Sequence, residues 1–233
     1  MNQPSGLVVL ISGRGSNLAA LARAAQDGVL PEPVRAAISD NPDAAGLSRA
    51  AEYGLDRVCI DRRRHPNRAQ FEASLDAAIE GFSPRYVVLA GFMRVLSADF
   101  VNRRRGQMIN IHPSLLPRHR GLDTHRKALE AGDREHGASV HFVTPALDGG
   151  PVISQTRIEV RADDSADALN LRLLPLEHRL LVHTMALLLT KTVEVHDETI
   201  HINDQVLNHP LDLDRDFAAP VADHAGAGTD RPS

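Results

Sequence analysis

Two polar side chains, those of Asn110 and His112, stand two residues apart in the mostly apolar stretch Met108 to Pro117 (MINIHPSLLP). If residues 108–112 form a strand, its side-chain period of two places Asn110 and His112 on the same face. Pro113 cannot donate a hydrogen bond to a sheet, so we expect the strand to end at His112. An amide donor beside a titratable ring suits a carbonyl oxygen that becomes an oxyanion. For an isolated Asn-x-His pair, a turn cap and a half-buried edge histidine are the simpler explanation, so other motifs must decide.

A glycine turn near the start of the chain has the character of an anion site. Residues 7–12 (LVVLIS) predict a strand buried on both faces, Gly13-Arg14-Gly15-Ser16-Asn17 follows at once, and residues 18–26 read as a helix. Such a turn aims free N–H groups and the positive end of a helix at one point. The third glycine of a dinucleotide fingerprint and the Lys-Ser/Thr of a P-loop are both missing. The turn therefore indicates a mononucleotide-like phosphate, with an ordinary strand-to-helix turn as the alternative.

Strands and helices alternate along the chain, which predicts an α/β fold with a Rossmann-like, mostly parallel twisted sheet and helices on both faces. The predicted strands are 7–12, 34–39, 56–60, 86–90, 108–112, 140–144, 152–160 and an outer strand at 193–201. The predicted helices are 18–26, 44–54, 68–82, 97–103, 124–131 and 165–191. Ligands of such sheets bind at the carboxyl ends of the strands, where the Gly13 turn, Gly91 and His112 all fall.

Two further loops stand out. Residues 91–96 (GFMRVL) follow a strand but are apolar with one cation, so they either line a pocket for a flat heterocycle or, more simply, pack on the core. Residues 147–151 (LDGGP) place two glycines and a proline around Asp148. The second loop predicts a tight turn that holds this carboxylate rigidly.

Composition limits the partners. The 233 residues are 42% hydrophobic with a net charge of −4, which suits one domain over residues 1–208 and a poorly ordered tail from 209 to 233. The mixed charges show no basic face for nucleic acid, so a small-molecule substrate is expected. No apolar run is long enough for a membrane span, and no signal peptide is recognised. Cys59 is the only cysteine and is expected to be a packed thiol. These features predict a cytoplasmic monomer or homodimer.

Four fragments, SGRGSN, AGFMRVL, INIHPSLLP and GASVHFVTPALDGGPVI, occur in an order and spacing that resemble the folate-dependent formyltransferases, most of all those of purine synthesis. Each fragment alone is weak evidence, but four in register are strong, and the match extends over residues 7–202. The resemblance implies a sheet that is mixed at one edge. It also implies 10-formyltetrahydrofolate as the formyl donor and the amine of glycinamide ribonucleotide as the acceptor.

The resemblance also assigns roles to individual residues. The catalytic set falls on Asn110, His112 and Asp148. The residues for the ribonucleotide phosphate and the acceptor are Gly15, Ser16, Asn17 and Glu177. The folate-binding residues are Arg68, Met93, Arg94, Val95, Leu96, Ala146 and Leu147, with the Asp148 turn beside them. Asp123, Pro145 and Pro175 depart from the usual family pattern, while the catalytic set is intact.

Other functions remain as alternatives. A metal hydrolase would need ligands among the twelve histidines, but no His-x-x-x-His or Cys-x-x-Cys spacing supports a metal site. A nucleotide-binding module would explain the glycine turn but not a catalytic set at separate strand ends. Within the family, a methionyl-tRNA formyltransferase usually adds a C-terminal barrel and a formyltetrahydrofolate hydrolase an N-terminal regulatory domain. We expect this chain to have room for neither, and the hydrolase or another folate-dependent formyltransferase is the second interpretation.

Overall fold

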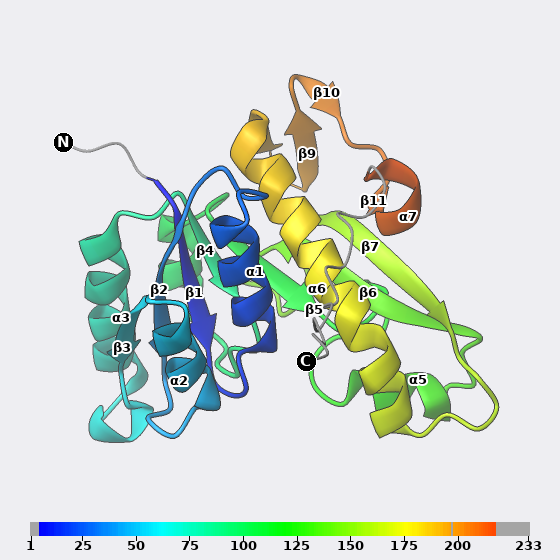
Figure 1. Ribbon diagram of the computed structural model, residues 1–233, viewed down its shortest axis with the longest axis horizontal. Helices are drawn as coiled ribbons and strands as arrows, with labels where there is room; N and C mark the ends of the chain where they lie inside the picture. Colours follow the sequence, from blue (N-terminus) through cyan, green and yellow to red (C-terminus); the bar gives the residue numbers. More distant parts are fainter. Residues whose placement is uncertain (1–4, 197, 218–233) are drawn as a thin grey trace, which may run out of the picture.

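The computed structural model describes residues 5–196 and 198–217 (Figure 1). In the first half the elements are β1 (Leu7–Ile11), α1 (Ser16–Gln26), β2 (Val34–Ser39), α2 (Ala45–Glu52), β3 (Asp56–Cys59), a 3-10 turn (Arg62–Arg64), α3 (Arg68–Phe82), β4 (Tyr86–Leu89), α4 (Ala98–Arg103) and β5 (Met108–His112). They continue with α5 (Thr124–Glu130), β6 (Glu135–Phe142), β7 (Val152–Glu159), α6 (Ala166–Thr190), β8 (Val193–His196), β9 (Thr199–Ile202), β10 (Gln205–Val206), β11 (Leu211–Asp212) and α7 (Leu213–Asp216).

The main sheet has the strand order β11-β7-β6-β5-β4-β1-β2-β3. Strands β1 to β5 run parallel to one another, whereas β6 is antiparallel to both β5 and β7. The predicted α/β class, with a mostly parallel sheet that is mixed at one edge, is confirmed. A separate antiparallel sheet of β8, β9 and β10 lies beyond the end of α6 (Figure 1). The carboxyl ends of β1, β4 and β5 therefore lie side by side.

Both faces of the sheet are covered, and the alternation within β1 shows how. Leu7 and Val9 point into the core cluster that α1 and α6 complete, while Val8 and Leu10 point into the cluster formed with α3 and α4. All four side chains are fully buried. A strand with apolar neighbours above and below must be aliphatic at every position, which explains the uninterrupted run in the sequence.

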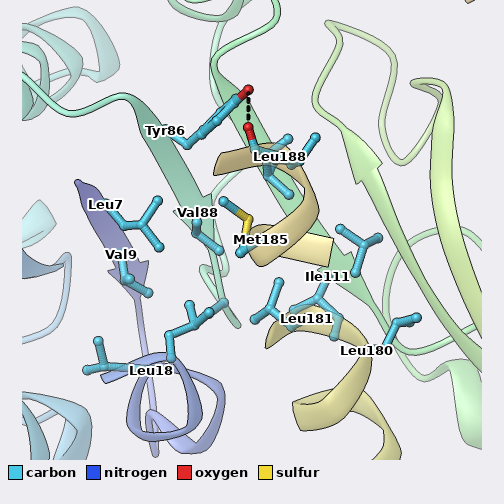
Figure 2. Packing of buried hydrophobic residues seen from close by; sticks show 14 of the residues in the cluster. Leu7, Val9, Leu18, Tyr86, Val88, Ile111, Leu180, Leu181, Met185 and Leu188 are labelled. Carbon is cyan, nitrogen blue, oxygen red and sulfur yellow. Dashed lines mark hydrogen bonds between the residues drawn. The ribbon is translucent and has the colours of Figure 1, made fainter. Parts of the chain in front are cut away.

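Helix α6 is the longest element and crosses one face of the sheet (Figure 1). In Figure 2 its Met185 and Leu188 lie beside Val88 of β4, and the Tyr86 hydroxyl donates a hydrogen bond to the Leu188 carbonyl at 3.4 Å. Pro175 lies inside α6, and the helix is continuous from residue 166 to 190. The packing fixes the helix, and with it Glu177, against the sheet and α1.

Several predicted boundaries differ from the structure. Strand β6 begins at residue 135 and not at 140, because β7 pairs with its polar start from Glu135 onward, while β5 joins only from Ser139. A Cβ on Gly137 would lie only 2.0 Å from the Thr156 carbonyl oxygen, so the strand interior requires this glycine. Helix α1 begins two residues earlier than predicted, at Ser16. The single outer strand predicted at 193–201 is a hairpin of β8 and β9.

Two other expectations concern the margins of the fold. Cys59 is exposed and not packed, because β3 is the edge strand of the main sheet. The tail predicted from residue 209 starts too early: Leu211 pairs with β7 and Leu213 is buried, so these two leucines extend the fold to α7. Residues 218–233 of that predicted tail lie outside the described residues. Among the helices of the described residues, none combines the length and apolarity that a membrane crossing requires.

Candidate active site

His112 and Asp148 meet at the end of β5. The Nδ1 atom of His112 lies 3.6 Å from Oδ2 of Asp148, an ion-pair distance for a charged ring. On the other side of the ring, Nε2 lies 3.0 Å from the His119 carbonyl oxygen. Because a carbonyl oxygen can only accept, Nε2 is protonated and donates the hydrogen bond. Both side chains are largely buried, with 7% and 10% of their surfaces exposed. A doubly protonated imidazole would present one N–H to each of these acceptors.

Asn110 faces His141 across β5 and β6. The antiparallel register pairs the two residues, and Nδ2 of Asn110 lies 3.0 Å from Nε2 of His141. The other ring nitrogen, Nδ1, lies 2.9 Å from the Phe142 carbonyl oxygen and must be the protonated one. Burial lowers the pKa of His141 and keeps its ring neutral. His141 therefore accepts one Asn110 N–H, which leaves the other N–H of the amide for a ligand.

The glycine-rich turn holds Asp148 rigidly, as its sequence predicts. Asp148 has a φ of 45°, and its Oδ2 accepts a hydrogen bond from the Gly121 N–H at 2.8 Å. A Cβ on Gly150 would lie 1.9 Å from the Phe142 carbonyl oxygen, and one on Gly149 would lie 2.8 Å from Ala146. Glycine at position 150 lets the turn close against β6, and glycine at position 149 lets it close on Ala146 of the same loop. Its carboxylate also lies 3.8 Å from His141 Nε2, so one acidic group faces two imidazoles.

A pocket opens beside these residues. Its walls are Leu89, Phe92, Arg94, Val95, Leu96, Val101, Asn110, His141, Val143, Thr144, Pro145, Ala146, Leu147 and Asp148. Five of the seven predicted folate-binding residues, Arg94, Val95, Leu96, Ala146 and Leu147, are in this lining. The mostly apolar walls with a few polar groups at one end suit a flat heterocycle whose reactive atom points toward Asn110 and Asp148.

The other two predicted folate residues lie near the pocket but do not line it. Met93 is 60% exposed, between Phe92 and Leu96, which are buried at either end of the loop. Arg68 donates a hydrogen bond to Glu72 at 2.8 Å, and Glu72 in turn accepts the Ser97 N–H at 2.7 Å. Arg68 is thus connected through Glu72 to the residue that follows the pocket loop.

The glycine turn and Glu177 form a second polar site. Gly15 has a φ of 69°, and a Cβ there would lie 2.6 Å from Cα of Gly46, so the turn requires glycine and packs against α2. Asn17 lies in the first turn of α1, and its Nδ2–H donates a hydrogen bond to Oε2 of Glu177 at 3.4 Å. Ser16 and Asn17 also start a helix whose first N–H groups have no partner within the helix. The structure brings together all four residues predicted for the phosphate and the acceptor.

The electrostatics of this second site favour a polar ligand. Burial raises the pKa of Glu177 to about 7, against the opposing effects of the Asn17 amide and the Arg14 charge. The Asn17 Oδ1 atom is buried and has no hydrogen-bond partner among the described residues. A ligand with hydroxyl or amine donors would satisfy both oxygen-bearing groups, while its phosphate would meet the helix N-terminus.

The three departures from the family pattern have different settings. Asp123 has a φ of 59° before α5, and its carboxylate pairs with Arg126 at 2.7 Å on the surface. Pro145 is in the pocket wall, and Pro175 lies within the continuous α6. Over residues 5–196 and 198–217, no group of three or more His, Cys, Asp or Glu side chains has an arrangement that could hold a metal ion.

Sequence reasoning missed His141, His119 and Gly121 as parts of the site. His141 appears in the sequence only as one of many histidines, and its role follows from the β5–β6 register. His119 and Gly121 contribute backbone atoms, for which a side-chain pattern gives no signal. The antiparallel pairing of the strand with the Asn-x-His pair was the information needed to find His141.

The fold and the site together define an α/β protein with a paired histidine and carboxylate beside an apolar pocket, and with a glycine turn at the start of α1. The family model described as "Formyl transferase" matches residues 6–185. The chain belongs to this family.

Named relatives are similar over most of this chain. The phosphoribosylglycinamide formyltransferase of Escherichia coli K12 is 43% identical over 201 residues, which are 86% of this chain and 95% of that protein. The human "Trifunctional purine biosynthetic protein adenosine-3" is 38% identical over 81% of this chain, which corresponds to 19% of that larger protein.

Solved structures agree with the sequence comparison. The phosphoribosylglycinamide formyltransferase of Coxiella burnetii has a TM-score of 0.85 at 40% identity, covering 90% of this chain and 99% of that one. The glycinamide ribonucleotide transformylase 1 of Symbiobacterium toebii has a TM-score of 0.82 at 35% identity, covering 87% and 95%.

Proposed function

We propose that this protein transfers the formyl group of 10-formyltetrahydrofolate to the amine of glycinamide ribonucleotide, a step of purine biosynthesis. The donor occupies the apolar pocket, with its formyl group toward Asn110 and Asp148. The acceptor phosphate lies at the Gly13 to Asn17 turn, and its ribose faces Glu177. The observation that carries the proposal is the His112–Asp148 pair, which lies beside a pocket that Asn110 and Asp148 themselves line.

In the proposed reaction, the neutral acceptor amine attacks the formyl carbon. A new C–N bond forms, and the carbonyl oxygen becomes an oxyanion that accepts hydrogen bonds from the free Asn110 N–H and from the His112 imidazolium. For this contact, His112 Nε2–H exchanges the His119 carbonyl for the formyl oxygen. The bond from the formyl carbon to N10 of the folate then breaks, and the proton of the amine is transferred to N10 through Asp148 or a bound water.

The roles of Asn110 and His112 differ in charge. Asn110 donates from a neutral amide that the neutral His141 ring orients, whereas His112 donates from a ring whose positive charge Asp148 stabilises. The Asn110 donor is oriented before the substrate arrives and loses little free energy to reorganisation in the transition state, whereas His112 Nε2–H must first leave the His119 carbonyl. No covalent enzyme intermediate is required, so direct transfer in a ternary complex is the expected kinetic form.

The test is a steady-state assay with both substrates, followed by the release of the deformylated folate. We expect turnover that depends on glycinamide ribonucleotide and none when it is omitted. Release of formate at a similar rate without the acceptor would instead favour the formyltetrahydrofolate hydrolase. Small molecules, and not nucleic acid, are the proposed substrates. A cytoplasmic location and a monomeric or homodimeric state stay predictions.

A further inference from the structure

A buried carboxylate next to the proposed active site has no role in the reaction described so far. Asp40 directly follows β2, at the same edge of the sheet as the glycine turn, and only 1% of its side-chain surface is exposed. A charged group at this depth is costly unless every oxygen has a partner. Its contacts therefore indicate what it is kept for.

Both oxygens of Asp40 bind groups that belong to the site. Oδ1 accepts the Ser12 hydroxyl at 2.6 Å, and Oδ2 accepts the Arg94 Nε–H at 2.5 Å. Arg94 is in the wall of the proposed donor pocket. Ser12 is the residue immediately before the glycine turn. One carboxylate thus connects the donor pocket with the strand end that carries the proposed phosphate site.

Ser12 extends this connection to the backbone of the pocket loop. Its hydroxyl oxygen accepts the Met93 N–H at 2.8 Å, and its own N–H donates to the Gly91 carbonyl at 3.1 Å. Because the hydroxyl proton is already committed to Asp40, the oxygen lone pairs face Met93. Asp40 therefore orients the Ser12 hydroxyl so that its oxygen accepts the N–H in the middle of the loop.

The middle of the loop depends on these polar contacts. Phe92 and Leu96 are buried in the core, but Met93 and Val95 between them are 60% and 62% exposed and gain little from packing. Arg94 is half exposed, so its pairing with a buried carboxylate is what fixes its side chain against the pocket. Without the carboxylate, Phe92 and Leu96 would still hold the two ends of the loop in the core, but residues 93–95 would lose the polar contacts that fix their conformation.

We infer that Asp40 is a positioning residue for the formyl donor: it holds residues 93–95 in the conformation that forms the pocket, through Ser12 and Arg94. The inference rests on the proposed function for the identity of the donor. Both carboxylate oxygens are needed, because an asparagine at this position would present an NH2 group in place of one of them, to either the Ser12 hydroxyl or the Arg94 Nε–H. The acceptor site on the far side of Ser12 rests on its own packing with α2 and is affected less.

The test compares Asp40→Asn with Asp43→Asn, a matched change at an exposed aspartate of the same segment. We expect Asp40→Asn to raise the KM for 10-formyltetrahydrofolate about 10-fold to 100-fold, the range for losing a hydrogen bond to a charged group, with the KM for glycinamide ribonucleotide changed less than about threefold. Asp43→Asn should leave both KM values unchanged. Equilibrium binding of folic acid, which carries a pterin ring but no formyl group, gives the same comparison without turnover.

A second variant covers the case in which Asp40→Asn does not fold. Ser12→Ala removes the hydroxyl between Asp40 and Met93 and should raise the donor KM in the same selective way, and the effects of the two changes together should be smaller than their sum. A donor KM within twofold of wild type in both variants would overturn the inference, as would equal losses for donor and acceptor. Absence of formyl transfer in wild type and Asp43→Asn would instead refute the proposed function.

Discussion

Asn110 and His141 are directly opposite each other in the antiparallel pair β5 and β6, with 3.0 Å between the amide nitrogen and Nε2. The hydrogen bond from His141 Nδ1 to the Phe142 carbonyl fixes which nitrogen is free to accept. A buried, neutral histidine therefore determines how the Asn110 amide points. The proposed oxyanion contact depends on this orientation as much as on the asparagine itself.

Replacing His141 should impair the chemical step. In His141→Ala the Asn110 amide loses its partner and rotates, so we expect kcat to fall about 10-fold, the equivalent of one hydrogen bond, with both KM values little changed. Steady-state kinetics with each substrate varied in turn measures this. In an Asn110→Ala background, His141→Ala should lower kcat little further, because the two residues act as one unit. Independent, additive effects would contradict the proposed orientation.

Replacing His112 should have a larger effect on the rate. His112→Ala removes the charged donor to the oxyanion, and the loss of such a donor typically lowers kcat by about 10²–10³. The KM for glycinamide ribonucleotide should stay within a few-fold, since the ring stabilises charge that develops only in the transition state. His196→Ala, at an exposed histidine of β8, is the matched control. A His112→Ala variant that keeps most of its turnover would end the assignment.

Glu177 should make stability depend on pH. Its pKa in the folded protein, about 7, lies above the ordinary value of 4.5, so the folded state binds more protons than the unfolded state between these values. The contribution of Glu177 to the free energy of unfolding is therefore present below pH 4.5 and is lost as the pH rises through 7, by about 3 kcal/mol.

Glu177→Gln tests this dependence, because glutamine has no carboxyl group to titrate. The free energy of unfolding of the variant minus that of wild type should therefore be about 3 kcal/mol more positive at pH 8 than at pH 4.5. Urea unfolding of both proteins at both pH values measures this difference. Equal differences at the two pH values would show that the carboxyl group does not titrate in this range. The KM of Glu177→Gln for the acceptor should also lose the pH dependence that ionisation of the carboxyl group gives to wild type.

The two glycines of the turn before α1 should respond differently to alanine. Gly15→Ala places a Cβ at a φ of 69° and 2.6 Å from Gly46, so we expect a loss of about 2 kcal/mol of stability and a higher KM for the ribonucleotide. Gly13→Ala meets no atom within 4 Å and should change stability by less than about 0.5 kcal/mol. Thermal unfolding of both variants makes the comparison. Equal losses would show that the close contact with α2 does not matter.

Much of the architecture is predictable from local sequence patterns. The aliphatic run of β1 requires apolar neighbours on both faces, and the proline after His112 ends β5 where the sequence predicts it. The glycines around Asp148 signal a turn in which side chains have no room, and the structure shows the close approach that excludes them. These features are local, so short stretches of sequence contain the information.

The remaining parts depend on contacts between distant segments. His141 becomes part of the site only through the β5–β6 register, and β6 itself starts with polar residues that are typical of a loop. Asp40 follows a strand at the edge where ligands of such sheets bind, so its position gave a signal, but its partners come from two other loops. The exposure of Cys59 follows from the strand order, which places β3 at the edge.

Direct transfer between two bound substrates can be followed in a single turnover with a ¹³C-labelled formyl group on 10-formyltetrahydrofolate. We expect the label to appear on the glycinamide ribonucleotide amine only when both substrates are present. The rate of its appearance should fall about 10²–10³-fold in His112→Ala, and the protein itself should carry no label. Labelled protein, or labelled formate released without the acceptor, would rule out direct transfer.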